Sequence, residues 1–155
     1  MPSERDLFSP DLVFFDWEPD SAEDLFRLLG GVLRERGNVG EGWFDAIVER
    51  EREFPTGLRV PGCGFAIPHV DPRHIVRPYI AVVKPRRPVV FEAMAGLGDP
   101  VPAEIVFNLG VLRDGGQVRA LQALMNIFAD EESVAQIMAQ TEPQDMVDAI
   151  LGHFE

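Results

Sequence analysis

The sequence predicts an α/β fold in which a mixed β-sheet is flanked by helices on its faces. Two amphipathic helical segments occupy the first third of the chain, short apolar runs separated by turn residues fill the middle, and three helical segments close it. With 155 residues, 46% of them hydrophobic, the chain can build one well-buried core. We therefore expect a single domain over residues 1–155, of which residues 1–10 form a loosely held tail.

The first third is expected to contain one short strand and two helices. Residues 12–15 form an apolar run between prolines, which is typical of a buried strand. Ser21 can cap a helix that Gly37 and Asn38 end. A second helix is expected from about residue 41 to 53, with a charged end and an apolar face. That face consists of Trp43, Phe44, Ile47 and Val48.

The middle of the chain predicts the sheet. A turn-rich loop at 60–64 leads into an apolar run at 65–67. This run stops at Pro68, which lacks a backbone N–H, so we expect strand pairing to end there. The run at 79–83 is a strand, and the proline-rich turn that separates it from residues 89–91 predicts a hairpin.

The last third is expected to hold one buried strand and three helices. The strand lies within residues 104–112 and is followed by a turn at 113–116. Asp130 can cap a short helix, and residues 141–144 read as a capping box with Pro143 in the first turn of the last helix. The first of the three helices carries an apolar stripe of Val118, Leu121, Leu124, Met125 and Phe128.

The composition excludes several classes of protein. A formal charge of −12 argues against nucleic acid as a partner and favours proteins with basic docking faces. The single cysteine, Cys63, cannot form an internal disulfide, which suits a reducing compartment. No apolar stretch reaches membrane-spanning length, and the N-terminus lacks the basic and apolar regions of a signal peptide. We expect a soluble, cytoplasmic protein.

His69 is the strongest candidate for chemistry. It follows Pro68 at the end of the strand at 65–67, and Asp71-Pro72 comes just after it, so its backbone should be held still. A neutral imidazole has a lone pair that can act as base, metal ligand or nucleophile near pH 7. The alternative is a half-buried histidine at a strand end that only donates a hydrogen bond to a carbonyl.

Other candidate sites are weaker. Cys63 lies in Pro-Gly-Cys-Gly, but the polar continuation of a phosphate-cradling thiolate loop is missing, so we interpret it as a small loop or core residue. No dinucleotide fingerprint or Walker-type loop is present. His69, Asp71 and His74 match no ligand spacing, so we expect no metal. His74 is a second imidazole near the first or a loop residue, and His153 is expected at the surface.

The order of three short motifs resembles a known family. Arg50-Glu51, Pro55-Thr56-Gly57-Leu58 and Ala66-Ile67-Pro68-His69 follow one another as in enzyme IIA (EIIA) domains of the bacterial sugar phosphotransferase system, in the fructose/mannitol superclass. The resemblance runs from about Ser21 to the C-terminus. Residues 54–58 and the helix that begins near Gln117 lean toward the galactitol-type branch. The resemblance implies the type-2, mannitol IIA-like fold.

The resemblance also implies an activity. In this family the histidine accepts a phosphoryl group from the carrier HPr and passes it to a cysteine on a IIB partner, which serves the IIC membrane transporter. Carried across, His69 is the phosphorylated nucleophile of a phosphotransferase component, Arg50 offsets charge on the phosphoryl oxygens, and Thr56 donates a hydrogen bond near the ring. Such transfer needs an in-line nucleophile and nearby positive charge. It needs no nucleotide or other cofactor.

The sequence also departs from the family pattern. Gln117 stands where some members carry a second histidine, although it can still donate to phosphate. The loop between Thr56 and His69 looks longer than in mannitol-type members, so either Arg50 or Arg52 could face the site. Because an EIIA domain does not contact sugar, the resemblance implies no particular sugar and no oligomeric state.

Two other functions fit the same scaffold. One is a regulatory module in which the phosphorylation state of His69 controls a partner such as a kinase, a transporter or a transcription regulator. The other is a binding domain that has kept the scaffold without phosphotransfer. The presence of Arg50, Thr56 and His69 argues against the second of these.

Overall fold

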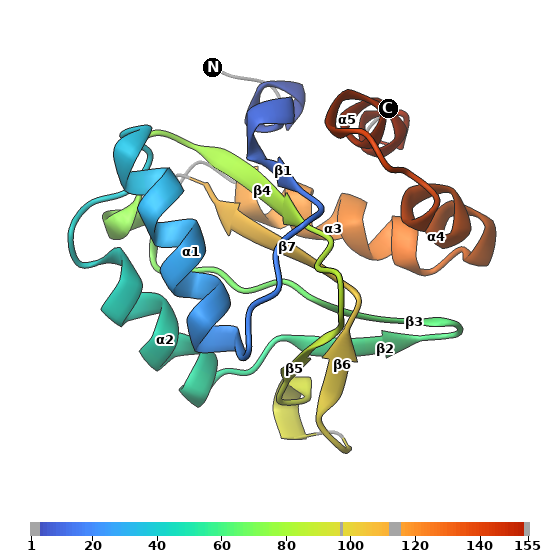
Figure 1. Ribbon diagram of the computed structural model, residues 1–155, viewed down its shortest axis with the longest axis horizontal. Helices are drawn as coiled ribbons and strands as arrows, with labels where there is room; N and C mark the ends of the chain where they lie inside the picture. The colour runs from blue at the N-terminus through green and yellow to red at the C-terminus, as the bar shows by residue number, and fades with distance from the viewer. Residues whose placement is uncertain (1–3, 97, 112–115, 154–155) are drawn as a thin grey trace.

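The computed structural model describes residues 4–96, 98–111 and 116–153, and over these residues the chain forms a mixed sheet with helices on both faces (Figure 1). The sheet strands are β1 (Val13–Phe14), β2 (Gly57–Val60), β3 (Cys63–Ala66), β4 (Tyr79–Val83) and β7 (Ile105–Gly110). They lie in the order β1-β4-β7-β3-β2. β1 and β4 run parallel, as do β3 and β7, whereas β4 is antiparallel to β7 and β2 to β3. The predicted fold class is confirmed.

Two groups of helices cover the sheet. The first group is α1 (Ala22–Glu35) and α2 (Trp43–Glu53), and the second is α3 (Gly116–Phe128), α4 (Glu131–Met138) and α5 (Pro143–Leu151) (Figure 1). Along β4, Tyr79, Ala81 and Val83 pack toward the first group. Ile80 and Val82 pack toward the second. The sheet is thus buried on both sides, which explains its nearly continuous apolar strands.

The helix caps explain where the helices begin. The N–H of Asp24 donates to Ser21 Oγ at 3.0 Å, and the N–H of Ser133 donates to Asp130 Oδ2 at 3.2 Å, as the sequence predicts. The capping box expected at the last helix is wrong: Glu142 is its N-cap and makes no side-chain cap hydrogen bond. Pro143 does occupy the first turn, where its missing N–H loses nothing.

The apolar faces of the helices match the predictions in part. In α2, Trp43 and Ile47 are fully buried, whereas Phe44 and Val48 are only partly covered. In α3, Leu124 and Phe128 are buried, but Met125 is 39% exposed, so the apolar stripe is narrower than expected.

The predicted hairpin between residues 79–83 and 89–91 is wrong. β4 already pairs with β1 on one edge and with β7 on the other, so it has no free edge for a hairpin partner. Residues Val89–Phe91 form β5 instead, which pairs with β6 (Val101–Ala103) in a separate two-stranded sheet. This small sheet lies beside β2 and β3 in Figure 1.

Two segments are more ordered than the sequence suggests. Leu7 and Phe8 lie in the core, so this end of the expected loose tail is held down by short 3₁₀ turns at Glu4–Leu7 and Pro10–Leu12. The loop expected at 60–64 is a tight β2-β3 hairpin in which Val60 pairs with Cys63. Gly62 supplies the positive φ of +81° that this turn requires.

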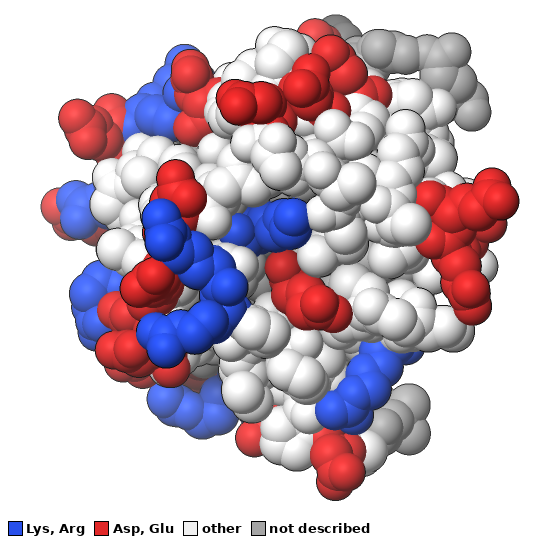
Figure 2. All heavy atoms as spheres, turned by 45° about the vertical axis from the view of Figure 1, so that its right-hand side comes forward, with Lys and Arg blue, Asp and Glu red and all other residues white. Residues whose placement is uncertain are grey.

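The charges are unevenly distributed over the surface. In the view of Figure 2, basic side chains gather mainly at one side, among acidic ones, and much of the centre is uncharged. Within the described ranges, no helix is long and apolar enough to cross a membrane.

Candidate functional site

His69 lies beyond the end of β3, three residues after Ala66. Pro68 precedes it and Val70, which is buried, follows it, so the histidine is half-exposed between two buried neighbours. The expectation that pairing ends at Pro68 is wrong in one respect. Pro68 lacks a donor, but its carbonyl oxygen accepts from the N–H of Leu109 at 3.1 Å, and His69 itself pairs with Leu109 in a parallel bridge. The backbone of His69 is therefore anchored to β7.

The ring of His69 has a defined orientation. Nδ1 lies 2.8 Å from the carbonyl oxygen of Ile67. A carbonyl can only accept, so Nδ1 carries the hydrogen, and in the neutral ring the lone pair is on Nε2. Burial lowers the pKa of His69 below its ordinary 6.5; the charge of Arg50 adds to this effect, while the hydrogen bond to Ile67 opposes it. The ring is thus neutral near pH 7, with Nε2 available as a nucleophile.

Arg50 and Arg52 point to different parts of the surface. Arg50 comes near enough to His69 for its charge to act on the pKa of the ring, and its guanidinium carbon lies 5.4 Å from the centre of the exposed Phe54 ring. Arg52 lines a separate cavity between α1, α2 and β5. Of these two arginines, Arg50 is therefore the one whose charge acts on the pKa of His69.

Thr56 bonds to Glu51. Its N–H donates to Glu51 Oε2 at 2.7 Å, and its hydroxyl donates to the same carboxyl group, with Oε1 at 2.9 Å. Burial raises the pKa of Glu51 to about 7, although these bonds and the charge of Arg50 act in the opposite direction. Both donor groups of Thr56, its N–H and its hydroxyl, are therefore bonded to the Glu51 carboxyl group.

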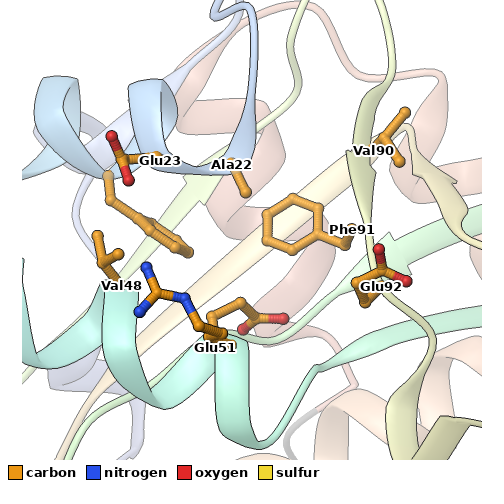
Figure 3. A pocket seen from close by; sticks show the side chains of 9 residues that line it. Ala22, Glu23, Val48, Glu51, Val90, Phe91 and Glu92 are labelled. Carbon is orange, nitrogen blue, oxygen red and sulfur yellow. The ribbon is translucent and has the colours of Figure 1, made fainter.

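Glu51 is the residue that the sequence reasoning missed. It appears there only as the neighbour of Arg50, and its role depends on contacts that a linear motif does not reveal. Figure 3 shows the Glu51 side chain extending across a cavity toward Phe91 and Glu92. The Glu51 carboxyl group, whose pKa is about 7, thus lies between this cavity and Thr56.

His74 lies near Arg50 but in a different setting from His69. It ends a 3₁₀ turn at Pro72–His74, and Arg73 Nε donates to its Nε2 at 3.4 Å. His74, Arg73 and Arg50 line one cavity of about 290 Å³, together with Phe54 and acidic side chains. Among the residues described, no three His, Cys, Asp or Glu side chains gather as a metal site.

The remaining candidates contribute less. Gln117 lies in the first turn of α3, and its side chain falls outside the described part of the structure, as do residues 113–115 of the expected turn. Cys63 is buried in β3, and burial, together with the charge of Glu104, raises the pKa of its thiol to about 11. A thiol of this kind is a poor nucleophile, so Cys63 is a structural residue. His153 contacts Gln136 at 3.3 Å near the C-terminus.

Comparison with known proteins identifies the family. The family described as "Phosphoenolpyruvate-dependent sugar phosphotransferase system, EIIA 2" matches residues 6–152. The chain belongs to this family. Domains of this family are components of a phosphotransferase system, so the resemblance carried by the motifs around Arg50, Thr56 and His69 is confirmed.

The chain is similar to several individual members of this family. This EIIA chain is 28% identical over 121 residues to the galactitol-specific EIIA component of Escherichia coli K12, covering 78% of this chain and 80% of the relative. Its fold matches that of enzyme IIA-mannitol in a complex with phosphorylated enzyme IIB-mannitol from Escherichia coli, with a TM-score of 0.74 at 18% identity over 94% of this chain and 97% of that one. It also matches the nitrogen regulatory protein IIA-Ntr of Neisseria meningitidis, with a TM-score of 0.73 at 23% identity over 94% and 97%.

Proposed function

We propose that this EIIA domain is a phosphocarrier that accepts a phosphoryl group from HPr on Nε2 of His69. It then passes the group to a cysteine of a IIB partner, as one step in the uptake of a sugar or sugar alcohol through a IIC transporter. The observation that carries the proposal is the bond between Nδ1 of His69 and the carbonyl oxygen of Ile67, because it leaves Nε2 with the lone pair. The galactitol-specific relative supports a sugar alcohol as the transported compound.

The transfer balances without any further reactant. The lone pair of Nε2 forms a bond to phosphorus while the bond between phosphorus and the donor's histidine nitrogen breaks, and the electron pair of that bond returns to the donor ring. Nδ1 keeps its hydrogen and its bond to Ile67. In the second step the phosphorus moves to the cysteine sulfur of IIB, and Nε2 recovers its lone pair.

Arg50 supplies the positive charge that this chemistry needs. Charge spreads over the equatorial oxygens of the phosphoryl group in transit, and a fixed guanidinium stabilises it. Thr56 and Glu51 support Arg50: the partly buried carboxyl group of Glu51 accepts the Thr56 hydroxyl bond, and the charge of this carboxyl group changes the electrostatic field around the Arg50 guanidinium.

Phosphorylation in a reconstituted system tests the proposal. The full chain is incubated with phosphoenolpyruvate, enzyme I and HPr, and its intact mass is measured without acid. One phosphoryl group is expected on the wild type and on His74→Ala, and none on His69→Ala. A wild type that stays unmodified, while the same HPr phosphorylates another EIIA, overturns the proposal. A phosphorylated wild type that transfers to none of a panel of IIB proteins overturns the transport role and points to regulation.

A further inference from the structure

A buried polar network lies directly behind His69. Asn108 is in the middle of β7 and is fully buried, and its side chain lies on the face of the sheet that α1 and α2 cover. Its neighbours on that face, Val106 and Ala81, are apolar. A buried amide is unfavourable unless it is hydrogen-bonded, so its partners indicate what it does.

Both ends of the Asn108 amide are bonded. Its Oδ1 accepts from the hydroxyl of Tyr79 at 2.5 Å, and its Nδ2 donates to the carbonyl oxygen of Pro68 at 3.0 Å. Because a tyrosine hydroxyl that stays protonated donates to the oxygen, the nitrogen must face Pro68. Burial raises the pKa of Tyr79 far above its ordinary value, so the hydroxyl keeps its hydrogen.

A glycine makes room for Tyr79. Tyr79 pairs with Gly110 across β4 and β7, and a Cβ added at Gly110 would overlap the tyrosine ring. The ring therefore lies directly against Gly110. From this position its hydroxyl reaches Asn108, two residues back along β7.

The end of the network is the peptide that carries the histidine. The Pro68 carbonyl accepts two hydrogen bonds, one from Asn108 and one from the N–H of Leu109. The peptide bond that joins Pro68 to His69 is planar, so fixing its oxygen also fixes the N–H side that belongs to His69. The proline ring limits the remaining rotation.

We propose that Asn108 and Tyr79 are positioning residues that hold the Pro68–His69 peptide so that Nε2 of His69 points at the incoming phosphorus. This inference rests on the proposed phosphocarrier function. An in-line transfer tolerates little displacement: moving a reacting atom by about 1 Å can slow a reaction about 100-fold. The Ile67 carbonyl sets the rotation of the ring, and the Asn108 amide sets the place of the backbone from which the ring extends.

Three variants separate positioning from general stability. Asn108→Leu removes both bonds with little change in size, and Tyr79→Phe removes only the hydroxyl. Ser133→Ala is the matched control, since it deletes a buried hydroxyl that donates to Asp130 at the start of α4, in the other layer of the molecule. Two quantities are measured on each full chain: the single-turnover rate of transfer from phosphorylated HPr as a function of HPr concentration, and the ¹⁵N signals of the His69 ring.

The proposal predicts a specific pattern. Asn108→Leu should slow the saturated transfer step by about 10- to 100-fold and Tyr79→Phe by several-fold. The half-saturating HPr concentration should stay the same because neither residue is on the surface. Both variants should shift the His69 ring signals, and Ser133→Ala should change neither quantity.

The outcomes distinguish this proposal from the proposed function. Wild-type rates and unshifted His69 signals in a folded Asn108→Leu overturn the positioning role and leave the phosphocarrier intact. If the wild type itself accepts no phosphoryl group, the phosphocarrier fails, and the ring signals alone decide whether Asn108 positions His69. If Asn108→Leu does not fold, Tyr79→Phe carries the test, because it keeps the ring over Gly110 and loses only one oxygen.

Discussion

Nδ1 of His69 and the carbonyl oxygen of Ile67 lie 2.8 Å apart, two residues from each other in the chain. This short-range bond selects the nitrogen that reacts. Because Nδ1 already carries a hydrogen, a further proton must bind at Nε2, the nitrogen that the proposed reaction uses. Protonation of His69 therefore blocks the reaction.

The titration of His69 should have its midpoint below pH 6.5. Burial disfavours the charged ring, and Arg50 acts in the same direction. Protonation removes the lone pair of Nε2, so the rate of phosphoryl acceptance should fall as the pH falls through this midpoint. Because the pKa of His69 is lower in the folded state than in the unfolded state, the free energy of unfolding should be highest above pH 6.5. It should decrease as the pH falls through the pKa of His69 in the folded protein. NMR titration of the His69 ring checks this, and a midpoint above 6.5 would contradict it.

Glu51 should make the protein less stable as the pH rises from about 4.5 to about 7. Its pKa is raised from 4.5 to about 7, so in this window the folded state binds a proton that the unfolded state has lost. The shift corresponds to at most about 3 kcal/mol. Glu51→Gln keeps the shape of the side chain but cannot titrate. In urea unfolding measurements, it should remove this contribution to the decrease of the free energy of unfolding with rising pH. Glu49→Gln, at an exposed position of α2, is the control and should keep it.

Arg50→Ala should slow phosphoryl transfer to His69 by about 100-fold, because removing one preorganised positive group has an effect of this order. Arg52→Ala should change the rate little, since Arg52 lines the separate cavity between α1, α2 and β5. The two variants have the same net charge, so any difference between their rates reports the position of the lost positive charge. Equal rates in both variants would show that Arg50 does not act on the phosphoryl group.

Gly110→Ala should lower the free energy of unfolding by about 1–3 kcal/mol, because the new methyl group would overlap the Tyr79 ring. Gly31→Ala offers a matched comparison. It lies at an exposed position in α1 with open space around it, and there alanine should add about 0.5–1 kcal/mol by favouring the helix. Denaturant unfolding measures the free energy of unfolding of both variants. A Gly110→Ala protein as stable as the wild type would contradict the prediction and mean that the Tyr79 ring can move away at no cost in stability.

The sequence predicts the features that local chemistry determines. Ser21 and Asp130 start helices because each side chain accepts an N–H only three residues away. Pro68 and His69 stand out for a similar reason, since a proline ends an apolar run and presents the next residue at the sheet edge. These signals lie within a few residues of one another, so a linear reading finds them.

The features that the sequence does not predict depend on distant partners. Residues 89–91 follow a turn, but they pair with β6 because β4 has no free edge. The bond from the Thr56 hydroxyl to Glu51 spans only five residues, but the linear motif does not indicate it. Asn108 reaches the site from 40 residues away, and a lone polar residue in an apolar strand gives no hint of its partner.

The most direct test of the account is to find which atom carries the phosphorus. The phosphorylated, ¹⁵N-labelled chain is examined by NMR for the coupling between ³¹P and the ring nitrogens of His69. Phosphorus is expected on Nε2, with Nδ1 still bearing its hydrogen. Phosphorus on Nδ1, on His74 or on another residue would contradict it, because the bond between His69 and Ile67 would then not select the reacting nitrogen.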